Sequence, residues 1–324
     1  MLSLALQQDP SQDANALLKQ AYETKSAGKR ADALTLFEKL LQDYPNTSAG
    51  AEAAWMVAYY RLNDRRFEEA ERLFQQVSNH LLAPTDIQAE ALLQTGFVYI
   101  SRYWASADRS GAERWKLLEE GKTRLLQIAQ KLSTRKDEVG RTAAGYALLG
   151  VGEAYLYQGL PEQAEVAYRK ILAEPEGIHP VVLAQGWYAL GVSLYRQRKY
   201  GQALEAFEQV KKIGEVGEGI VLRSLALGNA LPERAWMWQA AIWSRLGDAE
   251  RSLSALEQSL SRPQRLAGSR NAVLLTQAQK WLEGMRRVVA RSKEREQKLA
   301  ELRRVASQIE QHLPANVSPS QSSR

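Results

Sequence analysis

The sequence contains no cysteine and three histidines, His80, His179 and His312. The lack of cysteine excludes disulfides, thiol nucleophiles and cysteine-ligated zinc, and it leaves the redox compartment undecided. Each histidine stands alone, so the sequence has no spacing typical of a metal site. No apolar run approaches the roughly 20 residues that a membrane-spanning helix needs. We therefore expect no cofactor, no metal site and no transmembrane segment.

Proline is also sparse. The ten prolines separate stretches rich in Ala, Leu, Glu, Gln and Arg, which are good helix formers. No stretch is predicted to form a strand, and Gly214, Gly217 and Gly219 match no nucleotide-binding loop. Paired carboxylates such as Glu68 and Glu69 lie among basic residues and indicate solvated helix surfaces. The composition predicts an all-α protein without a converging catalytic site.

Basic charge is concentrated near the C-terminus. The formal net charge of the chain is +6, and the stretch 286–304 alone has eight basic and three acidic residues. The isoelectric point of about 9.3 is therefore a local property of one helix-length stretch. Its basic residues are Arg286, Arg287, Arg291, Lys293, Arg295, Lys298, Arg303 and Arg304.

One spacing of residues recurs along most of the chain. A bulky residue is followed by Leu-Gly three and four places on, and then by aromatic, small and aromatic residues. The clearest copy consists of Trp187, Leu190, Gly191, Tyr200, Ala203 and Phe207, and variants begin at Leu148 and Trp236. The two small residues let two helices approach to about 8–10 Å, while the large residues fill the groove beside them.

This spacing resembles the tetratricopeptide repeat, a helix pair of about 34 residues that stacks into solenoids. The resemblance implies about six repeats and a helix-hairpin solenoid over residues 13–265. Pro45 and Pro84 end the first two pairs, because proline cannot continue a helix. A solenoid of this kind implies a surface that holds other molecules, and the fold alone implies no chemistry.

Two stretches depart from the repeat. The third pair opens regularly with Leu92, Gly96 and Tyr99, but its second helix is predicted to begin only near Trp115. Residues 101–112 would then be an insertion. Residues 214–231, glycine-rich and then apolar, predict a loop with a short extra helix.

A long helix is predicted to follow the repeats. Apolar residues from Leu275 to Leu313 keep a spacing of three to four, which predicts a basic C-terminal helix over 270–313. Its first block, around Trp281, is expected to cap the last repeat, and its second block to project or to pair with another chain. The Ser-, Pro- and Gln-rich residues 314–324 predict a disordered tail.

The basic stretch of this helix has three interpretations. A solvated helix face is the simplest, because mixed charge is common on long helices. Heptads from Leu299 to Leu313 favour a coiled-coil partner or self-association. Binding to nucleic acid or anionic lipid is the weakest, because glutamates interrupt the stretch and no aromatics are interleaved with it.

The resemblance also implies where a partner would bind. In the family, the first helix of each repeat lines a concave groove, and carrying that register over places a row of aromatic residues there. Lys and Asn at the positions that grip a peptide carboxylate in some family members are absent here. The predicted groove residues are Tyr22, Trp55, Tyr59, Phe97, Tyr146, Tyr188 and Tyr195, together with Leu93 and Leu149.

An aromatic groove suits an apolar peptide or a helix, since rings bury large areas at small entropic cost. The alternative is that individual rings belong to the core of their own repeat or are covered by the C-terminal helix. A row of rings on one face nevertheless favours a partner. The sequence therefore predicts a non-enzymatic protein–protein interaction scaffold. The alternative function is an oligomer-forming or anionic-surface tether that acts through the basic helix.

A finer resemblance concerns the cellular setting. Residues 37–47, with Tyr-Pro-Asn-Thr at the end of a second helix, and the alanine-rich residues 51–55 resemble bacterial envelope repeat proteins. Those families are the outer-membrane assembly lipoproteins and the Tol–Pal-associated periplasmic proteins. The apolar start of residues 1–12 predicts either a flexible end or the remnant of a signal peptide. A signal remnant would indicate the periplasm, and a flexible end the cytoplasm.

Overall fold

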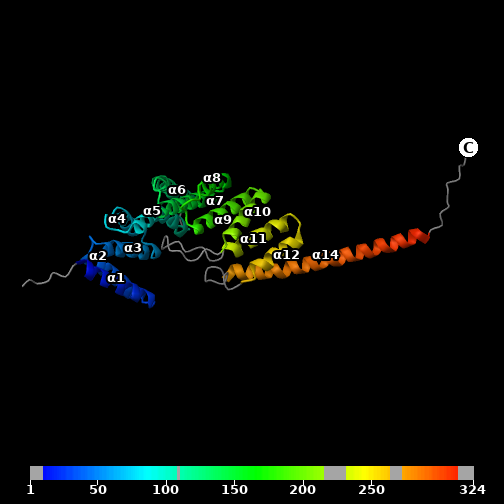
Figure 1. Cartoon of the computed structure of the whole chain (residues 1–324), viewed down its shortest axis with the longest axis horizontal. Helices are drawn as coiled ribbons and strands as arrows, with labels where there is room; N and C mark the ends of the chain where they lie inside the picture. Colours follow the sequence, from blue (N-terminus) through cyan, green and yellow to red (C-terminus); the bar gives the residue numbers. More distant parts are fainter. Residues whose placement is uncertain (1–9, 108–109, 215–230, 263–271, 313–324) are drawn as a thin grey trace, which may run out of the picture. The chain divides into compact units, whose positions relative to one another are not determined.

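The computed structural model of the chain describes residues 10–107, 110–214, 231–262 and 272–312. Within these ranges every regular element is a helix and none is a strand (Figure 1). The all-α prediction is therefore confirmed. The chain divides into two compact units, Met1–Pro232 (unit 1) and Glu233–Arg324 (unit 2).

Unit 1 consists of helix pairs that follow one another along the chain. The two helices of each pair pack on each other, and each second helix also packs on the first helix of the next pair. The pairs are α1 (Pro10–Ser26) with α2 (Arg30–Asp43), α3 (Ser48–Asn63) with α4 (Phe67–Ser78), α5 (Thr85–Ala105) with α6 (Gly111–Ser133), α7 (Glu138–Tyr157) with α8 (Pro161–Ala173), and α9 (Pro180–Arg196) with α10 (Tyr200–Ile213). This is the stacked helix-hairpin architecture that the repeat predicts.

The turn inside a pair depends on a residue in the left-handed region. Gly28 and Gly159 have φ values of 78° and 74°, which glycine adopts without a steric penalty. In the corresponding turns of two other pairs, Arg65 and Arg198 take φ values of 61° and 62°. A single left-handed residue ends a helix and redirects the chain, so each turn lets the second helix fold back on the first.

Glycine opposite a large ring fixes how closely the two helices of a pair approach. A Cβ atom added to Gly152 would lie 2.2 Å from Cε1 of Tyr168, and one added to Gly191 would lie 2.7 Å from Cε1 of Phe207. Both rings are fully buried. The small residue and the aromatic residue of the repeat therefore meet across the pair, which is the contact that the sequence spacing predicts.

The first helices of unit 1 form a layer of their own. Contacts join α1 to α3, α3 to α5, α5 to α7 and α7 to α9. Among the described residues, no comparably extensive contacts join the second helices to one another. We call the side formed by α1, α3, α5, α7 and α9 the first-helix face, because residues from five repeats come together on it.

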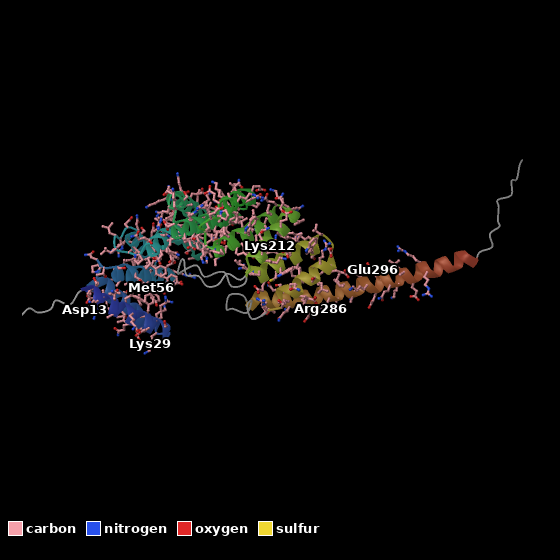
Figure 2. The ribbon with its side chains drawn as sticks, in the orientation of Figure 1. Asp13, Lys29, Met56, Lys212, Arg286 and Glu296 are labelled. Carbon is pink, nitrogen blue, oxygen red and sulfur yellow. The ribbon has the colours of Figure 1, made fainter. Side chains whose placement is uncertain are left out.

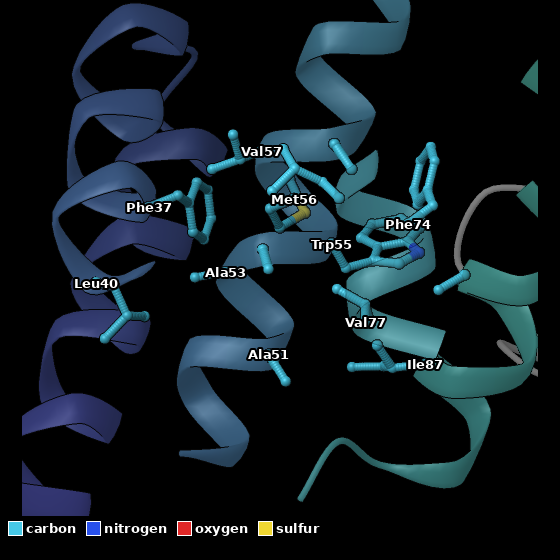
Figure 3. Close-up of a cluster of buried hydrophobic side chains, with 14 of the residues drawn as sticks. Phe37, Leu40, Ala51, Ala53, Trp55, Met56, Val57, Phe74, Val77 and Ile87 are labelled. Carbon is cyan, nitrogen blue, oxygen red and sulfur yellow. The ribbon is translucent and has the colours of Figure 1, made fainter. Parts of the chain in front are cut away.

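The core of the first repeats is continuous from one pair to the next. Phe37 of α2, Met56 of α3 and Phe74 of α4 are fully buried in the same cluster, and Trp55 is buried beside Phe74 (Figure 3). Since α3 supplies side chains to both neighbours, no pair has a core that is complete without the next one.

The third pair differs from the sequence prediction. Residues 101–112 were expected to form an insertion before a second helix near Trp115, but α5 continues to Ala105 and α6 begins at Gly111. The side chain of Ser110 accepts a hydrogen bond from the backbone N–H of Glu113, and the Glu113 carboxylate accepts one from the backbone N–H of Ser110. This capping box starts the helix earlier than the repeat register alone indicates. The extra residues therefore lengthen both helices.

Unit 2 contains α11 (Leu231–Arg245), α12 (Ala249–Ser259) and α14 (Ala272–His312). Buried Ala240, Leu256 and Met285 form its core, against which Trp236 and Trp281 pack. The first part of α14 therefore covers the last hairpin, as predicted. This shared core also explains why the chain divides near residue 232, whereas the sequence places the end of the solenoid at residue 265.

The two halves of α14 differ in burial. Ala278, Met285 and Val289 are buried, whereas every residue from Ala290 to Glu301 is exposed. Figure 2 shows Glu296 on the part of α14 that extends past α12. The helix thus caps the hairpin with its first half and projects with its second. The predictions for residues 1–9, 215–230 and 314–324 concern residues outside those that the structure describes.

The contact between glycine and ring gives a direct test of the fold. Gly152→Ala should lower the free energy of unfolding by about 1–3 kcal/mol, because the added methyl group overlaps the buried Tyr168 ring. In a helix, alanine is otherwise better than glycine by about 1 kcal/mol. Urea denaturation followed by circular dichroism measures the difference.

Gly201→Ala is the matched control, because no atom lies within 4 Å of a Cβ atom at this position of α10. This variant should be as stable as the wild type or slightly more so. An equal gain in stability for both variants would contradict the assigned contact.

Candidate partner-binding face

One partly exposed side chain from each first helix forms a row along the first-helix face. The small residue of each first helix points at its paired second helix, and the residue immediately after it points to the neighbouring side. None of these residues is fully buried. The row, here called the central row, consists of Tyr22, Tyr59, Phe97, Glu153 and Val192.

The rings at the start of the row are held in place by contacts within unit 1. The Tyr22 hydroxyl donates a hydrogen bond to Oε1 of Glu52 at 2.6 Å, which links α1 to α3. Tyr59 stacks on Trp55 with ring centroids 5.7 Å apart. Such fixed rings lose little conformational entropy when a partner covers them.

Trp55 is buried, contrary to its predicted place in the groove. Its side chain is 3% exposed and belongs to the core cluster, where it meets Phe74 edge-on at 6.5 Å (Figure 3). The groove register placed it on the surface, but the neighbouring helix covers it. Trp55 therefore offers almost no surface that a partner could contact.

Tyr146 is also buried, contrary to its predicted place in the groove, with only 6% of its surface exposed. Burial, followed by the nearby negative charge of Glu90, raises the pKa of its hydroxyl far above the ordinary value. The ring therefore stays neutral and offers almost no surface. The sequence predicted its helix and its side of the repeat, but not its burial.

The remaining predicted rings are half-buried. Phe97 lies against α7, where a Cβ atom at Gly150 would be 2.8 Å from Cε1 of Phe97. Tyr188 meets Phe207 edge-on at 5.9 Å, and Tyr195 is tilted against Tyr200 at 5.7 Å. Of the seven predicted rings, five therefore keep surface that a partner could cover, namely those of Tyr22, Tyr59, Phe97, Tyr188 and Tyr195.

Glu153 is the residue of the face that the aromatic pattern missed. The residue as a whole is exposed, but the protein packed around its carboxyl raises the pKa of that group by desolvation. Among the described residues it makes no hydrogen bond or ion pair. The signal was available in the sequence, because Glu153 directly follows Gly152, the small residue of its repeat.

Two of the three histidines have local structural contacts. His80 lies with Nε2 3.0 Å from the carbonyl oxygen of Pro45, and its Nδ1 accepts a hydrogen bond from the backbone N–H of Leu82. His179 precedes α9, and its Nδ1 accepts a hydrogen bond from the backbone N–H of Val181. His80 therefore has a role in a turn, and His179 caps the start of α9.

The described residues contain no group of three or more His, Cys, Asp or Glu side chains placed to hold a metal ion. Within the same ranges, every helix is too short or too polar to span a bilayer.

The basic residues of α14 between Arg286 and Arg304 fall into two groups. Arg286 pairs with Glu257 at 3.0 Å and Lys293 pairs with Glu250 at 3.3 Å, so these two fasten α14 to α12. Exposed ion pairs of this kind contribute little, about 0–1 kcal/mol each. The others are exposed to solvent: Arg287, Arg291, Arg295, Lys298, Arg303 and Arg304.

The geometry agrees with comparisons to known families. Profiles of the tetratricopeptide repeat match residues 14–47 and 184–214, which correspond to the first and fifth helix pairs. The pairs between them have the same architecture. The chain therefore contains tetratricopeptide repeats at its first and fifth helix pairs. No protein of curated function matches its sequence.

Solved structures resemble the chain in fold at low sequence identity. BtubC from P. vanneervenii has a TM-score of 0.52 and 14% identity, with 79% of this chain and 92% of that one covered. A signal transduction ATPase with a tetratricopeptide repeat sensor, from Pyrococcus horikoshii, has a TM-score of 0.53 and 13% identity, with coverage of 84% and 37%. PilF from Pseudomonas aeruginosa has a TM-score of 0.49 and 15% identity, with coverage of 78% and 92%. The likeness to the first two shows the fold alone.

Glu153 gives a prediction about stability and pH. Its pKa is raised in the folded chain, so the folded state keeps a proton that the unfolded chain loses above pH 4.5, the ordinary value. The free energy of unfolding should therefore fall as pH rises, because the folded chain must give up the proton of the Glu153 carboxyl. The difference in unfolding free energy between Glu153→Gln and the wild type should grow in favour of Gln from pH 4 to pH 7, measured by urea denaturation. A difference independent of pH would contradict the assigned desolvation.

Proposed function

We propose that this protein is an interaction scaffold that binds an extended peptide or a helix of a protein partner along the first-helix face. The observation that carries the proposal is the central row, in which five repeats each present one partly exposed side chain. Repeat solenoids expose such rows because each repeat presents the same position on the same side.

The chemistry of the row indicates the kind of segment that fits. Tyr22, Tyr59 and Phe97 offer large apolar surfaces, which favour apolar side chains of the partner. Glu153 has no described counter-ion, so a lysine or arginine of the partner would gain an ion pair there. We therefore propose an apolar segment that carries a basic residue.

The cellular setting of this scaffold is part of the same proposal. The resemblance of residues 37–55 to bacterial envelope repeat proteins supports a role as a subunit of an envelope assembly. We propose no enzymatic activity, because scaffold repeats need no reactive groups for this role.

The test of the face uses two substitutions that leave the core intact. Tyr59→Ala and Glu153→Lys should together lower partner affinity by about tenfold or more, since rings and charges at an interface centre dominate binding. The full chain and its variants are compared by affinity capture from source cells, followed by titration of the recovered partner. Trp55→Ala is unsuitable, because emptying a buried tryptophan site costs about 3–5 kcal/mol.

Glu205→Lys, an equal charge reversal at an exposed position of α10, is the matched control and should bind like the wild type. Equal capture by the wild type and the double variant, with unchanged circular dichroism, would refute the face. Equal loss in the control would indicate a general effect of charge.

A second candidate function rests on the projecting half of α14. Every residue from Ala290 to Glu301 is exposed, and Leu299 keeps 52% of its surface. An apolar stripe on an otherwise charged helix favours pairing with a second copy. The basic residues Arg295 and Lys298 on the same half support an alternative contact with an anionic surface.

Light scattering separates these alternatives. If α14 pairs with a second copy, the full chain has the mass of a dimer and Leu299→Asp has that of a monomer. If it contacts an anionic surface, Arg295→Gln with Lys298→Gln weakens salt-sensitive binding to DNA or phosphatidylglycerol vesicles. A monomer that binds neither probe would exclude the whole candidate.

A further inference from the structure

A second cluster of rings, none of which belongs to the central row, lies at the end of the third helix pair. Tyr103 and Trp104 are near the C-terminal end of α5, Trp115 is near the start of α6, and Tyr157 is the last residue of α7. We call these four residues the aromatic edge cluster. The extension of α5 to Ala105 and the early start of α6 bring the first three together.

The rings of the cluster contact one another directly. Trp104 meets Tyr157 edge-on with centroids 4.7 Å apart, and Tyr103 stacks on Tyr157 at 6.1 Å. Tyr103 also lies 6.3 Å from Trp115. Burial, together with the charge of Glu153, raises the pKa of the Tyr157 hydroxyl to about 12. The cluster is thus a packed group of neutral rings.

Both tryptophans nevertheless keep a large exposed surface. Trp104 is 54% exposed and Trp115 is 43% exposed. Exposed apolar residues scattered singly are normal, but large rings gathered on one patch usually mark an interaction site. Tryptophan and tyrosine are also the residues most often found at the energetic centres of protein interfaces.

A cation without a described counter-ion completes the cluster. The guanidinium of Arg114 lies 4.9 Å from the ring centre of Tyr103, and its Nε is buried without a hydrogen-bond partner. Among the described residues Arg114 makes no ion pair, whereas nearby Arg102 pairs with Glu68 at 3.0 Å. The carboxylate of Glu113 on the same turn is committed to the Ser110 cap.

We propose that the aromatic edge cluster docks a protein segment in which a large apolar side chain stands beside an aspartate or glutamate. The exposed indoles of Trp104 and Trp115 cover the apolar side chain, and the carboxylate pairs with Arg114. An arginine held over a ring donates two parallel hydrogen bonds to a carboxylate, and its side chain loses little conformational freedom when it does so. The proposal concerns side chains that do not belong to the central row.

The distribution of charged side chains around this cluster does not suit a single-stranded nucleic acid as the partner. Stacking bases would suit the rings, but a phosphate backbone also requires a track of basic residues. Along α6 the basic residues that follow Arg114 near the cluster are paired with carboxylates: Lys116 lies 4.0 Å from Glu120, Lys122 pairs with Glu119 at 2.7 Å and Arg124 pairs with Glu71 at 2.7 Å. They form no unpaired basic track for a phosphate backbone, whereas a single carboxylate can pair with Arg114.

The test uses labelled synthetic peptides and the full chain. A short peptide of alternating Asp and Phe is the probe, and peptides with Lys for Asp or Ser for Phe are its controls. Fluorescence anisotropy should show binding of the Asp-Phe peptide alone, weakened about tenfold or more by Arg114→Gln and by Trp104→Ala with Trp115→Ala. Arg114→Lys should restore part of the affinity, since it keeps the charge but loses the planar fork.

Two matched controls should bind the Asp-Phe peptide like the wild type. Leu81→Ala removes another exposed apolar side chain, and Arg72→Gln removes another exposed arginine. Loss of binding in Tyr59→Ala but not in Arg114→Gln would overturn the proposal and place the site on the first-helix face. Equal binding of the Lys-Phe peptide, or tighter binding of oligothymidine than of the Asp-Phe peptide, would also overturn it. Circular dichroism confirms that each variant is folded.

Discussion

The close approach of two helices at a small residue is the contact on which the rest of this structure depends. Gly152 against Tyr168 and Gly191 against Phe207 leave no room for a side chain on the glycine. That contact fixes the rotation of each first helix about its own axis. Once the rotation is fixed, the next residue along the helix must face the neighbouring side. The packing of the core therefore also determines which side chains a partner would meet on the first-helix face.

The same constraint separates rings that stabilise the fold from rings that keep surface. The rings of Trp55 and Tyr146 are buried, whereas those of Tyr22 and Tyr59 are half-buried. The aromatic edge cluster arises differently, because α5 exceeds the other first helices of unit 1 in length. The two sets of side chains also differ in charge, with Glu153 in the central row and Arg114 in the aromatic edge cluster.

The sequence predicted the helix pairs well, because the contact between small and large residues lies within one repeat and is visible as a spacing. It predicted exposure less well, because exposure depends on the neighbouring repeat. The burial of Trp55 depends on α4, where Phe74 meets its ring. The predicted start of the second helix near Trp115 was wrong, because a local cap, Ser110 with Glu113, starts α6 at Gly111. The shared core of α12 and α14 likewise depends on a contact across a connection that no repeat spacing describes.

Hydrogen–deuterium exchange of the full chain, with and without the partner that it captures, tests the central claim most directly. The account predicts slower exchange on binding in α3, α5 and α7, around Tyr59, Phe97 and Glu153, with little change in the second helices. Protection confined to the second helices or to α14 would contradict it, because the central row would then lie outside the contact.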